Sequence, residues 1–342
     1  MRVDEFDYDL PEALIALHPA DRRDASRMLV VDRAAGAIRH GAFADLPESL
    51  RAGDLLVLND TKVLPARLFG RRATGGRVEF LLTEKLDGPR DGRETWRVLV
   101  GSSKRLRAGE TVALDAGIQA RIAAVEGDGC FRVDLPAGVE SILDDRGHVP
   151  LPPYIAARRE EVPEDRARYQ TVYAERPGSC AAPTAGLHFT PEVFFALARR
   201  GIGVARLTLH VGPGTFLPVR VDEVERHRMH EEAFEIPDET ARAVVETRRR
   251  GGRVVACGTT SARTLETWAA AGTTRGRTDL FIFPGFRFRV VDALLTNFHL
   301  PRSTLLMLVA SLAGTDLWRR AYDAAVRERY RFYSYGDCML VL

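Results

Sequence analysis

The sequence predicts an α/β fold in which one α/β domain is made from both ends of the chain and a β-rich segment is inserted into it. Helix and strand patterns alternate from residue 183 to the C-terminus, which is typical of layered α/β domains. Residues 63–140 instead contain short β-rich runs separated by turns with glycine. The 342 residues are enough for about two domains of ordinary size. We therefore place the α/β domain at 1–62 and 150–342, and the inserted domain at 63–149.

The N-terminal part of the α/β domain contains a short helix and two strands by its sequence pattern. Pro11 suits the first turn of a helix that extends to about Leu17, because the first helical residue needs no backbone donor. Residues 27–33 have the pattern of a strand. The more continuous apolar run at 53–60 is typical of a buried strand.

The inserted segment consists of β-rich runs at close spacing. None of them shows the 3.6-residue period of a helix, so we expect a small barrel or sandwich. The runs cover residues 63–72, 76–84, 95–103, 109–116 and 119–138. Five prolines between residues 150 and 180 then predict an irregular stretch.

Helices and strands alternate in the remainder of the chain. Thr190 can cap a helix that begins at Pro191 and ends before Gly201. Asp238 can cap a second helix, which would end before Gly251. The other expected helices lie near 261–270, 303–312 and 316–329, and the expected strands at 204–211, 253–257, 280–283 and 290–296.

Composition excludes several classes of protein. Hydrophobic residues make up 45% and charged residues 28%, so the chain is not mostly disordered. The longest apolar run, Leu305–Ala313, is too short to span a bilayer. Charged residues at positions 2, 4, 5 and 7 are unlike a signal peptide, and we expect a cytoplasmic protein. The net charge of +2 permits a nucleic-acid partner without requiring one.

Metal and redox chemistry are not indicated by the sequence. The four cysteines lie far apart and none forms a CxxC pair. His227 and His230 could face the same side of a helix, followed by Glu231, but no third ligand is evident nearby. We expect no metal site.

Three predicted strands end in residues suited to a ligand site. His210, Gly212, Gly214 and Thr215 follow the strand at 204–211. Thr259, Thr260 and Ser261 follow the next strand, and Asn297 and His299 follow the strand at 290–296. Because open α/β sheets bind ligands beyond the carboxyl ends of their strands, we expect a polar pocket there. Each motif alone also fits a tight turn, a helix cap or a buried histidine.

Two further segments carry candidate residues. His188 lies among small residues before the helix capped by Thr190. The aromatic segment at 330–340, which includes Tyr335 and Asp337, could stack on a base or fill the core of the sheet. Basic clusters could form a phosphate track only if they share a face; the two that we select are Lys104, Arg105 and Arg107, and Arg248, Arg249 and Arg250.

The motifs together resemble one family, the S-adenosylmethionine:tRNA ribosyltransferase-isomerases of queuosine biosynthesis. The resemblance spans nearly the whole chain in order. It is less distinct over residues 70–145, where the segment GSSKRLRAG (101–109) differs from the sequence that is usual in the family. The segments that carry it include LNDTKVLPARL, APTAGLHFT, TLHVGPGTF, HRMHEE, GTTSARTLE, TNFHLPRSTLLMLVAS and YRFYSYGD. The resemblance implies a three-layer α/β/α domain with a mixed sheet and an inserted all-β barrel-like domain.

The resemblance also implies a reaction. The ribosyl part of S-adenosylmethionine is transferred to 7-aminomethyl-7-deazaguanine at the tRNA wobble position and rearranged, giving epoxyqueuosine-tRNA, adenine and methionine. S-adenosylmethionine is then a consumed co-substrate, and no recycled cofactor is expected. The expected partners are S-adenosylmethionine and a tRNA anticodon stem-loop, with no membrane and no obligate protein partner, so that the chain acts as a monomer.

This chemistry needs proton transfer near neutral pH, which imidazoles can supply. We therefore interpret four histidines as candidate acids and bases: His210, His299, His188 and His230. Glu231 or Asp337 could orient an imidazole or hold the amine. Gly212 and Gly214 would admit the nucleoside, and the helix start at Thr259, Thr260 and Ser261 would receive the methionine carboxylate. Thr215, Asn297 and Tyr335 complete the expected binding set.

Two alternatives remain at this point. A methyltransferase would release S-adenosylhomocysteine, although the chain lacks a GxGxxG turn after an early strand. An RNA-binding module without catalysis would need basic and aromatic surface more than histidines at strand ends.

Overall fold

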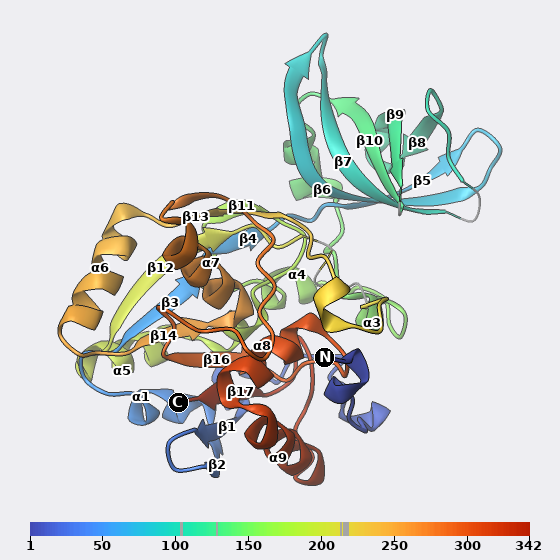
Figure 1. Cartoon of the computed structure of the whole chain (residues 1–342). Helices are drawn as coiled ribbons and strands as arrows, with labels where there is room; N and C mark the ends of the chain where they lie inside the picture. The colour runs from blue at the N-terminus through green and yellow to red at the C-terminus, as the bar shows by residue number, and fades with distance from the viewer. Residues whose placement is uncertain (103–104, 128, 213, 215–218) are drawn as a thin grey trace. The chain divides into compact units, whose positions relative to one another are not determined.

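The computed structural model describes residues 1–342 except 103–104, 128, 213 and 215–218 (Figure 1). The chain divides into two compact units. Unit 1 contains residues 1–61, 170–176 and 182–342, and unit 2 contains residues 62–169 and 177–181. Residues 150–169, which the sequence analysis places with the α/β domain, therefore belong to unit 2.

Unit 1 is built on a mixed sheet of nine strands in the order β15-β13-β12-β3-β14-β16-β17-β1-β2 (Figure 1). In chain order the strands are β1 (Arg27–Asp32), β2 (Ala37–Ala42), β3 (Leu55–Asn59), β12 (Gly203–Leu209), β13 (Glu232–Glu235), β14 (Val254–Cys257), β15 (Arg275–Thr278), β16 (Ala293–Asn297) and β17 (Cys338–Val341). The strands predicted from residues 27, 53, 204, 253 and 290 are thereby confirmed, with shorter bounds.

Four central strands point the same way. Strand β3 is parallel to β12 and to β14, and β14 is parallel to β16. Strand β17 is antiparallel to β16 and begins beside its end, where Cys338 pairs with Asn297. One edge of the sheet therefore collects the carboxyl ends of β12, β3, β14 and β16 together with the start of β17.

The side chains of alternate sheet residues enter a hydrophobic core on one face. Leu56, Leu58, Val255 and Leu295 pack there with residues of α1 (Leu46–Ser49) and α5 (Pro191–Arg199). Helix α5 begins as predicted, because Thr190 Oγ1 accepts a hydrogen bond from the backbone of the first turn.

Four longer helices complete unit 1. Helices α6 (Asp238–Arg249) and α7 (Gly258–Ala271) contact strands β12, β3 and β14. Helices α8 (Thr304–Ala313) and α9 (Thr315–Arg327) pack on one another, and α9 contacts β1. No helix in the described part of the chain has both the length and the apolar character that crossing a membrane requires.

Unit 2 contains a separate antiparallel sheet of six strands. Its order is β10-β7-β6-β5-β8-β9, and β9 pairs with β10, so the order closes on itself. The strands are β5 (Arg67–Arg72), β6 (Arg77–Arg90), β7 (Arg93–Ser102), β8 (Thr111–Leu114), β9 (Gln119–Gly127) and β10 (Cys130–Pro136). Their inward side chains, such as Phe80, Val98 and Ile122, form a core with Leu143.

The remaining elements are short. The chain also forms α2 (Val139–Arg146), α3 (Pro153–Ala156) and α4 (Asp165–Arg168), and β4 (Thr61–Val63) pairs with β11 (Arg176–Ser179). Helix α2, which the sequence analysis did not predict, follows the last β-rich run of the inserted segment.

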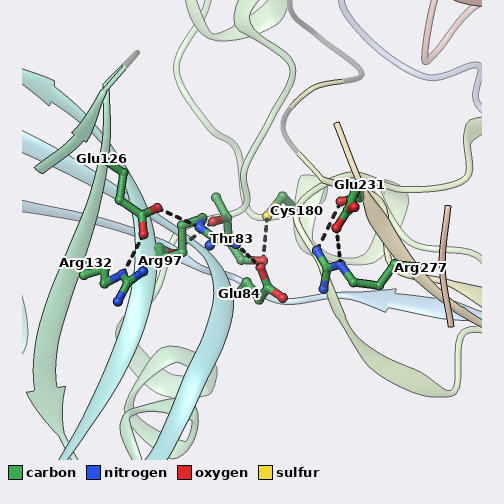
Figure 2. A network of polar contacts seen from close by, with 8 residues as sticks. All are labelled: Thr83, Glu84, Arg97, Glu126, Arg132, Cys180, Glu231 and Arg277. Atoms are coloured by element: carbon green, nitrogen blue, oxygen red, sulfur yellow. Dashed lines mark hydrogen bonds and ion pairs between the residues drawn. The ribbon is translucent and has the colours of Figure 1, made fainter. Parts of the chain in front are cut away.

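Ion pairs link the strands of unit 2 on its exposed side. Arg97 pairs with Glu84 on β6 and with Glu126 on β9, and Arg132 also pairs with Glu126 at 2.6 Å (Figure 2). Cys180 Sγ lies 3.5 Å from the carbonyl oxygen of Leu82. These contacts are structural, because each joins neighbouring segments of the same unit.

Three predicted elements differ from the structure. The helix expected after Pro11 is limited to a single 3₁₀ turn, Glu12–Leu14, because the Leu14 carbonyl accepts a hydrogen bond from Phe332. Asp238 is the first residue of α6, whose N-cap is Pro237. No helix covers residues 227–231, so His227 and His230 do not share a helical face.

The strand predicted at 280–283 is absent. Its backbone instead bonds to side chains, since Leu280 donates to the Thr278 hydroxyl at 3.1 Å and accepts from Arg263 Nε at 2.9 Å. Strand β15 forms just before it, in a polar segment that carries little strand signal.

Gly186 is the tightest glycine position in unit 1, which leads to a stability prediction. A Cβ at this residue would lie 2.1 Å from the Tyr173 hydroxyl oxygen and 2.8 Å from Thr171 Cγ2. We expect Gly186→Ala to lower the free energy of unfolding by about 1 to 3 kcal/mol, because overpacking forces the neighbours to move. Urea denaturation measures the change. Gly276→Ala is the control, since its nearest contact would be at 3.7 Å; equal effects of the two substitutions would contradict the prediction.

Candidate active site

Polar residues from separate parts of unit 1 meet at the edge where the parallel strands end. His210 follows β12, the segment Asn59–Thr61 ends β3, and Gly258 follows β14 directly. Asn297 ends β16 beside the start of β17. This is the edge at which open α/β sheets bind ligands.

Asn59 joins three of these strand ends, although the sequence analysis did not select it. Its Nδ2 donates to the carbonyl oxygen of Leu209 at 3.0 Å and to Thr260 Oγ1 at 3.2 Å. Its Oδ1 accepts from the backbone of Leu209 and Thr61 at 3.0 and 3.2 Å. Asn59 is fully buried, and the polar residue at the end of an apolar strand was the signal that could have identified it.

His210 is positioned by this network. Its Nδ1 lies 2.9 Å from Thr61 Oγ1, and the Thr61 hydroxyl is 3.4 Å from the carbonyl oxygen of Arg176. Among the described residues, Nε2 of His210 has no hydrogen-bond partner. Partial burial lowers the pKa of His210 below its ordinary value of 6.5, so the neutral imidazole is the dominant form at pH 7. A half-buried neutral imidazole of this kind can accept a proton.

His188 is held on both sides. Asn297 Nδ2 donates to the carbonyl oxygens of Tyr333 and Ser334, so Asn297 Oδ1 faces His188 Nε2 at 3.3 Å. His188 Nε2–H therefore donates to Asn297, and Nδ1 lies 2.9 Å from Ser26 Oγ. Burial lowers the pKa of His188 to about 4, although its hydrogen bond to Asn297 acts in the opposite direction.

His299 is buried behind the strand end. Its Nε2 lies 2.8 Å from Thr296 Oγ1, its backbone N–H donates to the Tyr322 hydroxyl at 3.0 Å, and its carbonyl accepts from Tyr8 at 2.5 Å. Burial lowers the pKa of His299 to about 3. His188 and His299 therefore stay neutral in the folded protein at pH 7, with contacts that hold loops together.

These two lowered pKa values predict acid destabilisation. Between pH 6.5 and about 4 the unfolded chain binds protons at His188 and His299 that the folded chain does not bind, so stability falls as pH falls through this window. Each histidine is expected to contribute about 1.4 kcal/mol per pH unit. Urea denaturation at pH 7, 5.5 and 4.5 measures the slope.

His188→Gln provides the matching variant, because glutamine supplies one donor and one acceptor. Its slope should be shallower than that of the original protein. An identical slope in the two proteins would show that His188 does not contribute to the acid sensitivity.

Three residues of the HRMHEE segment, His230, Glu231 and Glu232, lie in different surroundings. His230 is exposed and packs on Gly214, where a Cβ would lie 2.7 Å from His230 Cδ2. Glu231 is directed toward β15, where its carboxylate forms an ion pair with Arg277 at 3.0 Å (Figure 2). Glu232 is buried: its Oε1 accepts from the Gly212 backbone at 2.8 Å, and its Oε2 pairs with Arg263 of α7. The sequence analysis selected Glu231 and missed Glu232 and Arg263.

The start of α7 presents hydroxyl side chains at the same edge. Gly258 has a φ of +85°, which favours glycine, and lets the helix begin directly after β14. Thr259 is buried, and Thr260 accepts from Asn59. The Oγ of Ser261 is buried and has no hydrogen-bond partner in the described part of the chain.

Asp337 and Tyr335 belong to the C-terminal turn before β17. Asp337 accepts from the backbone N–H groups of Arg27 and Arg331 at 2.9 and 2.8 Å, and burial raises its pKa above the ordinary value of 3.8. Tyr335 is buried, as are Tyr330 and Phe332, so these rings fill the core. Of the two interpretations of this segment, packing in the core is the one that the structure supports.

Comparison with known proteins places this chain in a family. A family model described as queuosine biosynthesis protein matches residues 3–341. The chain belongs to this queuosine biosynthesis family. Among its relatives, the S-adenosylmethionine:tRNA ribosyltransferase-isomerase of Anaeromyxobacter sp. (strain Fw109-5) is 55% identical, over 100% of this chain and 99% of that protein. The protein of the same name from Rubrobacter xylanophilus is 54% identical, over 100% and 98% of the two chains.

A solved structure in the queuosine biosynthesis family is also similar. The crystal structure of S-adenosylmethionine tRNA ribosyltransferase from Thermotoga maritima is 40% identical, covers 99% of this chain and 100% of that chain, and gives a TM-score of 0.57. The mixed α/β architecture of this chain, with a large mixed sheet and a separate antiparallel sheet of six strands, is therefore similar to that solved structure.

The basic clusters lie away from the strand-end site or in the other unit. Arg248 bonds to the carbonyl oxygen of Arg289, and Arg249 and Arg250 share the carboxylate of Glu246. These three residues end α6, shortly before β14 begins, and so lie at the opposite edge of the sheet. Arg105 and Arg107 are exposed in unit 2. Lys104 and Thr215 lie outside the described residues.

The described residues contain no group of three or more His, Cys, Asp or Glu side chains placed to hold a metal ion.

Proposed function

We propose that this protein transfers and isomerises the ribosyl part of S-adenosylmethionine onto tRNA that carries 7-aminomethyl-7-deazaguanine at the wobble position. The products are epoxyqueuosine-tRNA, adenine and methionine. The main support is that the queuosine biosynthesis family match spans residues 3–341 while the polar groups of four strand ends meet at one edge of the sheet.

S-adenosylmethionine acts as a consumed co-substrate in this proposal, and no recycled cofactor is required. Its sulfonium acidifies the C5′ hydrogens of the ribose, so a base near that carbon can remove a proton. Loss of adenine requires a proton on the purine, and the attacking amine must be neutral. All three tasks are proton transfers that side chains can perform.

His210 is the residue best suited to such a transfer. The Thr61 hydroxyl donates to the Arg176 carbonyl, which leaves Thr61 Oγ1 to accept from Nδ1–H of His210. This arrangement favours the tautomer with a lone pair on Nε2, the form that accepts a proton. His188 and His299 then act as positioning residues, since their ring contacts are made within the protein. His230, exposed beside Gly214, is the second candidate for direct contact with substrate.

We also propose the finer features of the fold that the family resemblance implies. The six-strand sheet would be the inserted β-barrel, which the closed strand order supports. The nine-strand sheet would be the middle layer of an α/β/α domain. Residues of α1 and α5 belong to the core cluster that contains Leu56, Leu58, Val255 and Leu295. Helices α6 and α7 contact β12, β3 and β14 as well, but their residues are not part of that cluster. Both observations support helices on the two faces of the sheet.

The enzyme would act as a monomer. It would bind the anticodon stem of the tRNA, so that the anticodon loop enters the site. Single-stranded loops are the usual targets of specific RNA recognition, and phosphate contacts make binding weaken with salt. Arg105 and Arg107 are candidates for such contacts because both are exposed. The position of Arg248–Arg250 at the opposite edge makes them weaker candidates for a track that reaches the site.

A product assay tests the proposed function. Purified protein is incubated with S-adenosylmethionine and tRNA bearing the 7-aminomethyl base, and small molecules and digested nucleosides are identified by mass spectrometry. We expect adenine, methionine and an epoxyqueuosine nucleoside in equal amounts. Release of S-adenosylhomocysteine would instead indicate methyl transfer, and tRNA binding without consumption of S-adenosylmethionine would indicate a binding protein.

A further inference from the structure

The guanidinium of Arg263 is buried, and part of its donor capacity is unused. Arg263 is only 5% exposed. Its Nε donates to the Leu280 carbonyl at 2.9 Å and its Nη1 to Glu232, whereas Nη2 is buried and has no hydrogen-bond partner among the residues that the structure describes. An arginine carries five N–H donors and cannot relieve an unpaired group by losing a proton. A buried donor of this kind is costly unless another group, such as a ligand, pairs with it.

The position of this guanidinium relates it to the strand-end site. Long side chains on a helix point back toward its N-terminus, so Arg263 leans over the residues three and four positions earlier, Thr260 and Thr259. Glu232 bonds at the same time to Arg263 and to the Gly212 backbone that follows His210. Arg263 is therefore fixed between the first turn of α7 and the end of β12.

Two independent features of this helix turn favour a negatively charged ligand group. The backbone N–H groups of the first turn and the helix dipole attract an anion. Within the same turn, the Oγ of Ser261 is also fully buried, and no described residue is its hydrogen-bond partner. The neighbouring carboxylate of Glu232 is already committed to Arg263 Nη1 and Gly212, so it does not satisfy Nη2.

We propose that Arg263 Nη2 binds the carboxylate of the methionine part of S-adenosylmethionine, with the first turn of α7. The proposal rests on the proposed function and adds to it the residue that distinguishes the amino-acid end of this substrate. Glu232 acts as a positioning residue, because it holds the guanidinium and the Gly212 backbone in one arrangement. Binding the carboxylate here places the sulfonium and ribose toward the strand ends, where His210 lies.

Decarboxylated S-adenosylmethionine provides the test, because it keeps the adenine, ribose, sulfonium and amine and lacks only the carboxylate. Affinities of both compounds are measured by isothermal titration calorimetry for the original protein and for Arg263→Lys. We expect the original protein to bind S-adenosylmethionine about 10- to 100-fold more tightly, as for a hydrogen bond between charged groups. Arg263→Lys should lose most of this preference while its affinity for the decarboxylated compound stays unchanged.

Several results would overturn the proposal. Equal weakening of both compounds by Arg263→Lys would indicate a structural role only, and an unchanged preference would show that the carboxylate binds elsewhere. If Arg263→Lys does not fold, equal affinity of the original protein for the two compounds still refutes the proposal. Arg275→Lys is the matched control, since Arg275 pairs with Glu235 on the exposed side of β13 and β15.

The proposed function and the role of Arg263 are tested by separate experiments. The product assay with the original protein decides whether S-adenosylmethionine is consumed with release of adenine and methionine. The binding comparison decides whether Arg263 recognises the carboxylate, whatever product is formed.

Discussion

Replacement of His210 by alanine is expected to lower turnover by about 10²- to 10⁴-fold while the protein stays folded. The loss follows from removing the imidazole whose Nε2 has no partner among the described residues and which lies at the end of β12. Stability should change little, because the ring is only partly buried and its only hydrogen bond to a described residue is the one with Thr61. Steady-state formation of adenine, with thermal unfolding measured in parallel, tests both parts.

The pH dependence of kcat/KM provides a second test of the role of His210. Burial lowers the pKa of His210, so the neutral form that accepts a proton persists below pH 6.5. The acid limb of kcat/KM that belongs to this group should therefore lie below pH 6.5, with activity falling as the imidazole becomes protonated. In His210→Ala this limb should disappear from the residual activity.

Suitable controls separate catalysis from folding. His18→Ala removes an exposed histidine that lies outside the site and should leave turnover unchanged. His299→Ala should reduce turnover together with stability, because its ring is buried and bonded to Thr296. Near-normal turnover in both His210→Ala and His299→Ala would remove these histidines from the mechanism.

Replacement of Glu266 by alanine is expected to lower the free energy of unfolding by roughly 3 to 5 kcal/mol, the largest stability effect that we predict. Glu266 lies in α7 with its side chain fully buried. Its carboxylate accepts from three consecutive backbone N–H groups, those of Arg289, Val290 and Val291, at 2.8 to 2.9 Å. Alanine would leave the three donors without their acceptor, those of Val290 and Val291 in a buried position, or force the segment before β16 to open.

Urea denaturation of Glu266→Ala and Glu266→Gln measures this effect. Glutamine keeps one acceptor oxygen but turns an N–H₂ group toward a backbone donor, so its loss should be smaller than that of alanine. Glu239→Ala serves as the control, because Glu239 is exposed in the first turn of α6. A loss below about 1 kcal/mol in Glu266→Ala would show that water replaces the carboxylate.

Local sequence signals predicted most elements of the fold. Apolar strands such as β3 and β14 and capped helices such as α5 have their cause in nearby residues, and the structure confirms them. Strand β15 was not predicted, and the strand predicted at 280–283 was wrong. Their conformation depends on Arg263 and Thr278, which bond to Leu280.

The candidate site was predictable as a set of strand ends but not as a set of roles. Parallel strands bring His210, Thr260 and Asn297 to one edge, so their spacing in the sequence was sufficient to predict that they meet. Which histidine is half-buried and which is enclosed depends on packing, and His188 and His299 proved to be fully buried. Glu232 and Glu231 are neighbours in the sequence, and only the strand register of β13 turns one inward and the other to Arg277.

By itself, the sequence determined the fold class, the family and the edge at which the polar residues gather, because these follow from local patterns and from motifs in order. The tertiary structure alone decided that Asn59 links three strand ends and that Arg263 is buried with an unpaired Nη2. Such contacts join residues that are distant in the chain, and their hydrogen bonds and burial depend on the completed sheet and helices around them.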